Sequence, residues 1–229
     1  MKGENGMPEV IFNGPAGRLD GRYHAGPSAK SPIALVLHPH PQHGGTMNNK
    51  IVYALYHQFA NNGLSTLRFN FRGVGRSEGN YDQGEGELAD AAAALDWLQF
   101  QNPQYSQIWI GGFSFGSWIA MQLLMRRPEL SGFIAVSPPA HLYDFNFLAP
   151  CPISGKIIQG ISDGIVPVDS VDQLVKRLRL QRGIQIDYDR IPGADHFFTQ
   201  HMDLLSQSIQ QYLSQDPNRT KMCNLRIAG

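Results

Sequence analysis

A serine between two glycines is the first feature of this sequence that could do chemistry. Ser114 is the centre of a G-x-S-x-G pattern that runs from Gly112 to Gly116, after a β-rich run at 108–110 and before an apolar helical pattern at 117–126. A sharp turn from strand to helix would hold the hydroxyl at the amino end of the helix, and the flanking glycines would prevent collisions with both elements. The pattern predicts a nucleophilic serine, and a structural turn with an incidental serine is the alternative.

A serine hydroxyl is a weak nucleophile near neutral pH, so it needs a base, which a carboxylate in turn orients. Asp163 follows a predicted strand at 156–159, and His196 follows the last predicted strand, at 184–188. Because the carboxyl ends of parallel strands meet at one edge of a sheet, Ser114, Asp163 and His196 should lie together, in the chain order Ser, Asp, His. We predict these three residues as a catalytic triad.

Other acids and histidines near these loops have simpler interpretations. Asp169 begins a predicted helix and is interpreted as its amino-terminal cap. Asp195 directly precedes His196 and is interpreted as a local turn former. Three histidines are expected to be ordinary surface or half-buried residues: His24, His57 and His201.

The elements that must position these residues follow an α/β pattern. Two β-rich runs, 10–12 and 18–23, predict an antiparallel hairpin, and from residue 33 onward short apolar runs alternate with helical patterns. The pattern predicts a mostly parallel sheet of about eight strands with helices on both faces. Further strands are predicted at 33–37, 65–71 and 133–136, and further helices at 49–61, 88–98, 171–178 and 198–213. We expect one domain over residues 1–215 and a loosely held tail over 216–229.

Taken together, these motifs resemble the α/β-hydrolase superfamily over about residues 10–213. The runs LHPHPQHGGTMNNK at 37–50 and RFNFRGVGRS at 68–77 are similar to a compact bacterial group of serine esterases and dienelactone-hydrolase-like proteins. True dienelactone hydrolases carry cysteine as the nucleophile, so Ser114 argues against that chemistry. The resemblance implies the α/β-hydrolase fold. Only about 26 residues separate Val136 from Asp163, too few for an inserted lid domain.

Acyl transfer needs two hydrogen-bond donors aimed at the developing oxyanion. In the fold implied by the resemblance one is the amide of Phe115, the residue after the nucleophile. The second should come from the loop after strand 33–37, where Pro39 and Pro41 have no N–H, so we assign His40. The spacing of His38, His40 and His43 also invites a metal, but a supporting carboxylate is far along the chain, so we expect no metal and no organic cofactor.

An aromatic and apolar segment at 137–148 could form the wall of a substrate pocket. The tentative pocket residues are His38, His141, Tyr143 and Phe145. Ordinary packing of the segment on the sheet is the alternative, and for His38 the alternative is support of its own loop by hydrogen bonds.

These residues predict a serine hydrolase, a carboxylesterase that cleaves esters of short to medium acyl chains. A thioesterase or an acyl-peptide hydrolase with the same triad is one alternative. A non-catalytic binding protein on the hydrolase scaffold is another.

The composition limits which partners the protein can bind and where in the cell we expect it. Nineteen Lys and Arg balance nineteen Asp and Glu, which argues against a nucleic acid or an anionic membrane as the main partner and leaves a small-molecule ester. No run approaches about 18 apolar residues and no signal peptide precedes the first strand, so we expect a cytoplasmic protein. Cys151 and Cys223 are expected to be free thiols. The oligomeric state stays open, with a homodimer as one expectation.

Overall fold

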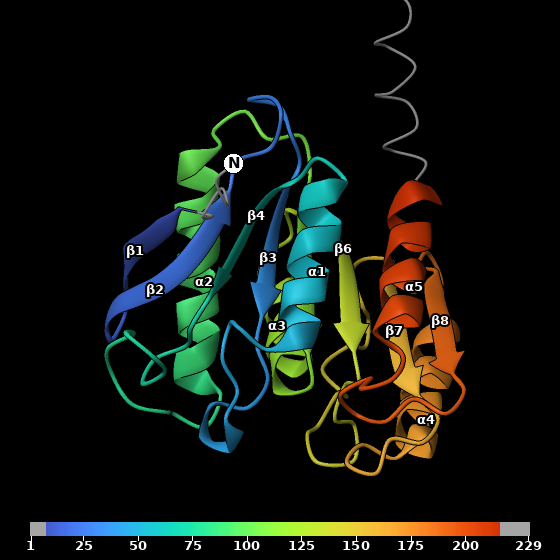
Figure 1. Ribbon diagram of the computed structural model, residues 1–229. Helices are drawn as coiled ribbons and strands as arrows, with labels where there is room; N and C mark the ends of the chain where they lie inside the picture. The colour runs from blue at the N-terminus through green and yellow to red at the C-terminus, as the bar shows by residue number, and fades with distance from the viewer. Residues whose placement is uncertain (1–7, 216–229) are drawn as a thin grey trace, which may run out of the picture.

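Eight strands form one twisted sheet in the order β1-β2-β4-β3-β5-β6-β7-β8 (Figure 1). The computed structural model describes residues 8–215, so the tail predicted at 216–229 lies outside the described residues. β2 pairs antiparallel with both β1 and β4, and every other pairing is parallel. The predicted α/β fold with a mostly parallel sheet is confirmed. The strands are β1 Glu9–Gly14, β2 Gly17–His24, β3 Ile33–Leu37, β4 Ser65–Phe69, β5 Ile108–Phe113, β6 Leu130–Val136, β7 Gly155–Gly160 and β8 Ile186–Ile191.

Helices cover both faces of this sheet. α1 and α5 lie over one face, in front in Figure 1, while α2, α3 and α4 lie over the other. Each face has its own buried apolar cluster, because the strands that pair in parallel are apolar on both sides. The helices are α1 Lys50–Asn61, α2 Glu85–Gln101, α3 Phe115–Leu124, α4 Val168–Arg179 and α5 Met202–Gln215, with a short 3₁₀ turn at Pro41–His43.

Some predicted boundaries are wrong by a few residues, for local reasons. β4 ends at Phe69 and not at residue 71, since the Phe71 amide donates to a histidine side chain in place of a neighbouring strand. α5 starts at Met202 and not at residue 198, because Phe198 sits in a turn with a φ of 51°. The last strand is shifted toward the carboxyl end, where Asp189 and Arg190 make its outer positions polar.

The loops that carry the predicted site residues lie at the sheet edge at the bottom of Figure 1. There the parallel strands β3, β5, β7 and β8 end, so the loops that follow them lie on one side of the molecule. β5, β6, β7 and β8 are successive neighbours in the sheet. The loops after β5, β7 and β8 therefore lie in a row, and they carry the three predicted triad residues.

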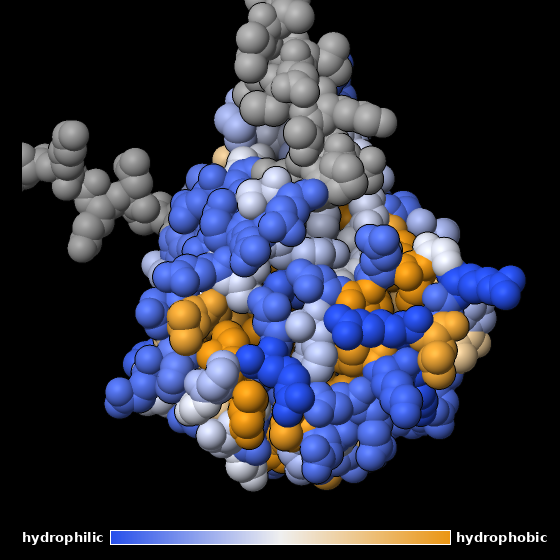
Figure 2. Space-filling view, turned by 90° about the vertical axis from the view of Figure 1, so that its right-hand side faces the viewer, coloured by the Kyte–Doolittle hydropathy of each residue, from blue (hydrophilic) through white to orange (hydrophobic). Residues whose placement is uncertain are grey.

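The outer strand β8 closes the sheet with charged side chains. Lys156 of β7 is buried and lies 2.8 Å from carboxylate oxygens of both Asp187 and Asp189 on β8. On the side that carries β8, Figure 2 shows small hydrophobic patches separated by hydrophilic residues. Charges on an outer strand discourage pairing with the strand of another chain. None of the helices within residues 8–215 is both long and apolar enough to span a membrane.

Candidate active site

Ser114 occupies the turn between β5 and α3. Its backbone has φ 52° and ψ −120°, a strained conformation for a residue with a side chain, and its amide donates to the carbonyl of Val136 at 2.9 Å. A Cβ on Gly112 would lie 2.4 Å from the carbonyl oxygen of Gly116, and one on Gly116 would lie 2.5 Å from that of Leu37. Both glycines are therefore required by the close approach of backbone on each side of the serine.

Asp163 lies in the loop after β7 with its carboxylate buried. Oδ1 accepts hydrogen bonds from the amides of Ile165 and Val166 at 2.8 and 2.7 Å, and Oδ2 lies 2.8 Å from Nδ1 of His196. Burial by itself would raise the pKa of the Asp163 carboxyl, but the hydrogen bonds from His196 and Val166 outweigh that effect and hold the pKa below its ordinary value. The carboxylate is therefore ionised at neutral pH.

His196 comes from the loop after β8, and its imidazole is held beside the serine turn. Its ring centroid lies 4.9 Å from that of Phe113, the residue before Ser114, and 5.1 Å from that of Phe197. Because Nδ1 donates to Asp163, a neutral imidazole keeps its lone pair on Nε2. Within residues 8–215, neither Nε2 nor the Ser114 hydroxyl makes a hydrogen bond, so both can engage a substrate.

The rival acids do not contact this histidine. Asp195 accepts from the amide and the hydroxyl of Thr199 at 2.8 and 2.7 Å, which is the local role predicted for it. Asp169 is exposed in the first turn of α4, and the residue that caps this helix is Pro167, so the prediction of Asp169 as the cap is wrong.

The loop after β3 turns at His40. The carbonyl of His40 accepts from the amides of His43 and Gly45, and its ring Nδ1 accepts from the amide of Gln42 at 3.2 Å. Nε2 lies 3.2 Å from the hydroxyl of Tyr81, in the loop before α2. Burial lowers the pKa of His40, and the nearby His43 lowers it further, so the ring is neutral near pH 7.

The two residues predicted to supply the oxyanion donors are in side-chain contact. The ring of His40 packs against the ring of Phe115 with centroids 5.0 Å apart. Phe115 is the first residue of α3, so its amide has no acceptor within the helix, and the His40 amide makes no hydrogen bond within residues 8–215. Both amides are therefore without a hydrogen-bond partner within residues 8–215, and their role as oxyanion donors stays a prediction.

Comparison with known proteins shows which family the chain belongs to. The protein-family model described as serine aminopeptidase, S33, matches residues 40–145. The chain is 56% identical over 211 residues to an uncharacterized protein of Rickettsia prowazekii, covering 90% of this chain and 89% of that protein. It is 55% identical to a protein of unknown function from Agrobacterium tumefaciens described as an alpha/beta hydrolase, with a TM-score of 0.90 over 92% of this chain and 97% of that one. The chain belongs to the α/β-hydrolase superfamily.

A third relative bears on whether a lid covers the candidate site. The solved structure from Xanthomonas campestris is described as a serine hydrolase without lid, and it is 30% identical, with a TM-score of 0.79 over 91% of this chain and 94% of that one. In the present structure the chain between β6 and β7, residues 137–154, contains no helix and no strand. Nothing in that connection could form a helical lid over Ser114.

His38 has a structural role in the loop after β3. It is fully buried, its Nε2 accepts from the amide of Phe71 at 3.0 Å, and its Nδ1 lies 2.6 Å from the carbonyl of Pro39. Both ring nitrogens are therefore used inside the protein. The structure supports the loop-bracing alternative for His38, and its assignment as a pocket residue is wrong.

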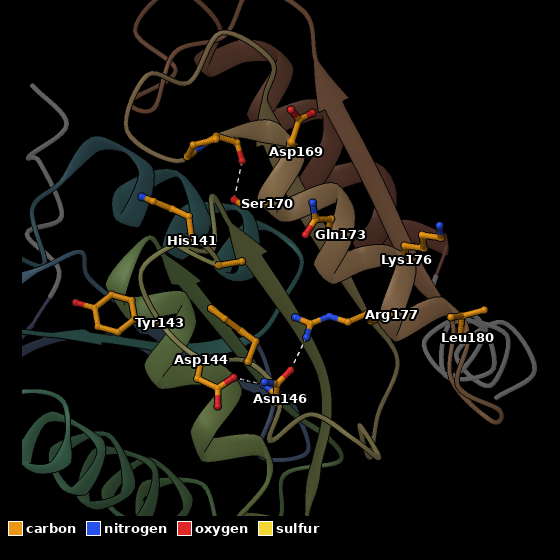
Figure 3. Close-up of a pocket in the computed structure, with 13 residues that line it drawn as sticks. His141, Tyr143, Asp144, Asn146, Asp169, Ser170, Gln173, Lys176, Arg177 and Leu180 are labelled. Carbon is orange, nitrogen blue, oxygen red and sulfur yellow. Dashed lines mark hydrogen bonds between the residues drawn. The ribbon is translucent and has the colours of Figure 1, made fainter.

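The other three tentative pocket residues line one groove (Figure 3). The groove holds about 830 Å³ and runs between the segment after β6, with His141, Tyr143 and Phe145, and one face of α4. The Tyr143 ring stacks on Trp118 at 4.2 Å and lies 6.0 Å from that of Phe115. Neither Ser114 nor His196 lines the groove, so it adjoins the helix that carries the nucleophile and is not the reaction centre itself.

The wall of the groove opposite the aromatic segment is polar. Arg177 is hydrogen-bonded to the side chain of Asn146 across it, as the dashed line in Figure 3 shows. The predicted aromatic wall therefore faces a polar one, and the groove is of mixed character. The polar residues of α4 that line it are Asp169, Ser170, Gln173, Lys176 and Arg177.

Two side chains at the site were not found from the sequence. Tyr81 reaches the ring of His40, and Gln159 reaches the carboxylate of Asp163 at 3.1 Å. A polar glutamine directly after the apolar pair Ile157 and Ile158, just before the Asp163 loop, was the available signal for Gln159, while no pattern pointed to Tyr81. Within residues 8–215, no three His, Cys, Asp or Glu side chains are grouped so that they could hold a metal ion.

Proposed function

We propose that this hydrolase cleaves carboxylic esters of short to medium acyl chains through Ser114, His196 and Asp163. The contact of 2.8 Å between Asp163 Oδ2 and His196 Nδ1 carries the proposal. It fixes the tautomer in which Nε2 accepts a proton, beside the turn that holds Ser114.

In the first half of the reaction the Ser114 oxygen attacks the ester carbonyl carbon while its proton passes to Nε2 of His196. The carbonyl electron pair moves onto its oxygen, where the amides of Phe115 and His40 stabilise the negative charge. The intermediate then collapses, the bond to the alcohol oxygen breaks, and His196 returns the proton to the leaving alcohol. The acyl group remains on Ser114.

Water completes the cycle by the same route in reverse. His196 takes a proton from water as the water oxygen attacks the acyl carbon, and the bond to Ser114 breaks as the serine oxygen regains the proton. Asp163 stays ionised throughout and stabilises the imidazolium that forms twice in each cycle. No step uses a metal or an organic cofactor.

The preference for short to medium chains rests on the openness of the site. The connection at 137–154 is too short and irregular to cover a long acyl chain, and the groove beside Trp118 is partly polar. Long apolar chains gain their binding energy from buried apolar surface, which such a site offers only sparingly.

A p-nitrophenyl ester series of increasing acyl length tests the proposal. We expect turnover that falls with chain length, and loss of turnover in Ser114→Ala with unchanged circular dichroism. Ser162→Ala, an exposed serine in the Asp163 loop, should keep full activity. Unchanged turnover in Ser114→Ala would contradict the assignment.

Thioesterase and acyl-peptide hydrolase activities use the same triad, so parallel assays on thioester and acyl-peptide substrates separate them from ester hydrolysis. A fluorophosphonate probe, which reacts with an activated serine, distinguishes an enzyme from a non-catalytic protein with the same fold. We expect it to label Ser114, and no labelling would favour a non-catalytic binding protein.

A further inference from the structure

Gln159 is a fully buried polar side chain, one residue before the end of strand β7 and four residues before Asp163. Its Nε2 lies 3.1 Å from Oδ2 of Asp163, 3.0 Å from the carbonyl of Val166 and 3.2 Å from the carbonyl of Gly160. The two hydrogens of one amide group are thus shared among three acceptors. A buried amide is costly unless it is hydrogen-bonded, so a side chain placed here needs these partners.

These contacts join Gln159 both to the acid of the triad and to the loop that carries it. Oδ2 of Asp163 receives both Gln159 Nε2 and His196 Nδ1, while Oδ1 receives two loop amides. Val166 is held twice, because its amide donates to Asp163 and its carbonyl accepts from Gln159. Within residues 8–215, Gln159 and His196 are the two side chains in hydrogen-bond contact with this carboxylate.

We propose that Gln159 is a positioning residue that fixes the plane of the Asp163 carboxylate toward His196 and takes up part of its negative charge. The inference rests on the triad proposed above and assigns to it a fourth member that does not touch substrate. Gln159 sits on a strand whose register to β6 and β8 is set by backbone hydrogen bonds, so it offers a rigid reference for a loop residue.

Loss of this N–H should change the chemistry in a defined direction. With one donor fewer, the carboxylate keeps more of its charge and attracts the imidazolium more strongly. The acid limb of the pH profile of kcat/KM should therefore move to higher pH. The carboxylate would also rotate more freely, so kcat should fall, while KM, which depends on contacts that Gln159 does not make, should change little.

Two variants test the role. Gln159→Leu keeps the approximate size and removes the donor, and we expect kcat to fall about tenfold, well short of the roughly 10⁴-fold effect of disabling the triad acid itself. Gln159→Glu places a second carboxylate against Asp163, and like charges at this distance disfavour ionisation of both. We expect it to be less active than Gln159→Leu near neutral pH.

Gln181→Leu is the matched control. Gln181 also bridges two backbone groups, the amide of Cys151 and the carbonyl of Leu148, but it does not touch Asp163. It should lower the melting temperature without moving the pH profile. Equal kcat values and equal acid limbs in Gln159→Leu and Gln181→Leu would overturn the proposal, because they would reduce Gln159 to a structural residue.

A measurement without substrate separates this proposal from the proposed function. Proton NMR of the folded protein reports the Nδ1 proton of His196 through its downfield resonance and through its titration. We expect Gln159→Leu to shift both relative to wild type, and Gln181→Leu to shift neither. An unshifted resonance would refute the role of Gln159 even if esters are hydrolysed, and a shifted one would support it even if no ester is a substrate.

Discussion

Nε2 of His38 accepts a hydrogen bond from the backbone amide of Phe71 at 3.0 Å, which ties the loop after β3 to the loop after β4. The same ring touches the carbonyl of Pro39 through Nδ1, so the neutral imidazole satisfies one backbone acceptor and one backbone donor. Burial, and secondarily the neighbouring His40, lowers the pKa of His38 to about 4, although the bond to Pro39 acts in the opposite direction. The brace of the oxyanion loop is therefore present only with a neutral histidine.

This relationship predicts that stability falls in mild acid. The pKa of His38 is about 4 when folded and about 6.5 when unfolded, so the unfolded chain binds the extra proton first. The stabilising contribution is complete above pH 6.5 and is lost as the pH falls toward 4, by on the order of 3 kcal/mol in the free energy of unfolding. Urea unfolding between pH 7 and pH 4.5 measures it. His38→Gln, which does not titrate, should show a shallower pH dependence, and exposed His141→Gln should not differ from wild type.

Asp163→Asn should disable the base without disturbing the fold. An asparagine amide at this position favours the wrong imidazole tautomer, so kcat should drop by about 10⁴-fold. Asp195→Asn and Asp169→Asn remove nearby carboxylates, one in the His196 loop and one in the first turn of α4, whose side chains do not contact His196, and both variants should retain activity within a few-fold. Ester hydrolysis by the three purified variants decides the matter. A large loss in Asp195→Asn alone would reassign the acid.

The proposed triad could be predicted from the sequence because each member lies in the connection just after a strand. Ser114, Asp163 and His196 follow β5, β7 and β8, and parallel strands bring such positions to one edge whatever the details of the loops. Some predicted strand and helix bounds are wrong by a few residues, because the last residues of an element depend on contacts such as that of Phe71 with His38.

Contacts between loops could not be predicted in the same way. Tyr81 lies in a glycine-rich loop with no periodic pattern, so nothing in the sequence gives the direction of its side chain toward His40. Gln159 fits the strand pattern of β7 equally well whether its side chain packs in the core or contacts the Asp163 loop, so the pattern does not give its partner. The partner of His38 could not be predicted either. A histidine in this position of the sequence could line a pocket, or it could be buried and hold the loop by hydrogen bonds.

Gly116→Ala should be severe, although it adds one methyl group. The new Cβ would lie 2.5 Å from the carbonyl oxygens of Leu37 and His38, and backbone atoms cannot rotate away as a side chain can. We expect a loss of about 3 kcal/mol in the free energy of unfolding and loss of ester hydrolysis, because α3 and the His40 loop must separate. Thermal unfolding and activity measure both. Gly164→Ala, with no heavy atom within 4 Å of the added Cβ, should behave like wild type.

The buried ion pair of Arg72 and Asp90 should hold the loop that carries Tyr81. Asp90 is fully buried, its Oδ1 lies 2.8 Å from Nη2 of Arg72, and its Oδ2 accepts from both Nε and the amide of Arg72 at 3.0 Å. Asp90→Ala would leave a buried arginine without its strongest partner, which costs roughly 3 to 5 kcal/mol. We expect that loss in urea unfolding, with a smaller fall in kcat as Tyr81 loses its place beside His40.

The exposed pair of Arg18 and Glu78 provides the control for this prediction. Here Nε and Nη2 of Arg18 both contact one oxygen, Oε1 of Glu78, at 2.9 and 2.6 Å, but both side chains are solvated, so water replaces the lost partner. Glu78→Ala should therefore destabilise the protein far less than Asp90→Ala. Equal losses in the free energy of unfolding of the two variants would contradict this prediction. They would show that burial of Arg72 does not increase the cost of removing its partner, and that other contacts hold the loop before α2.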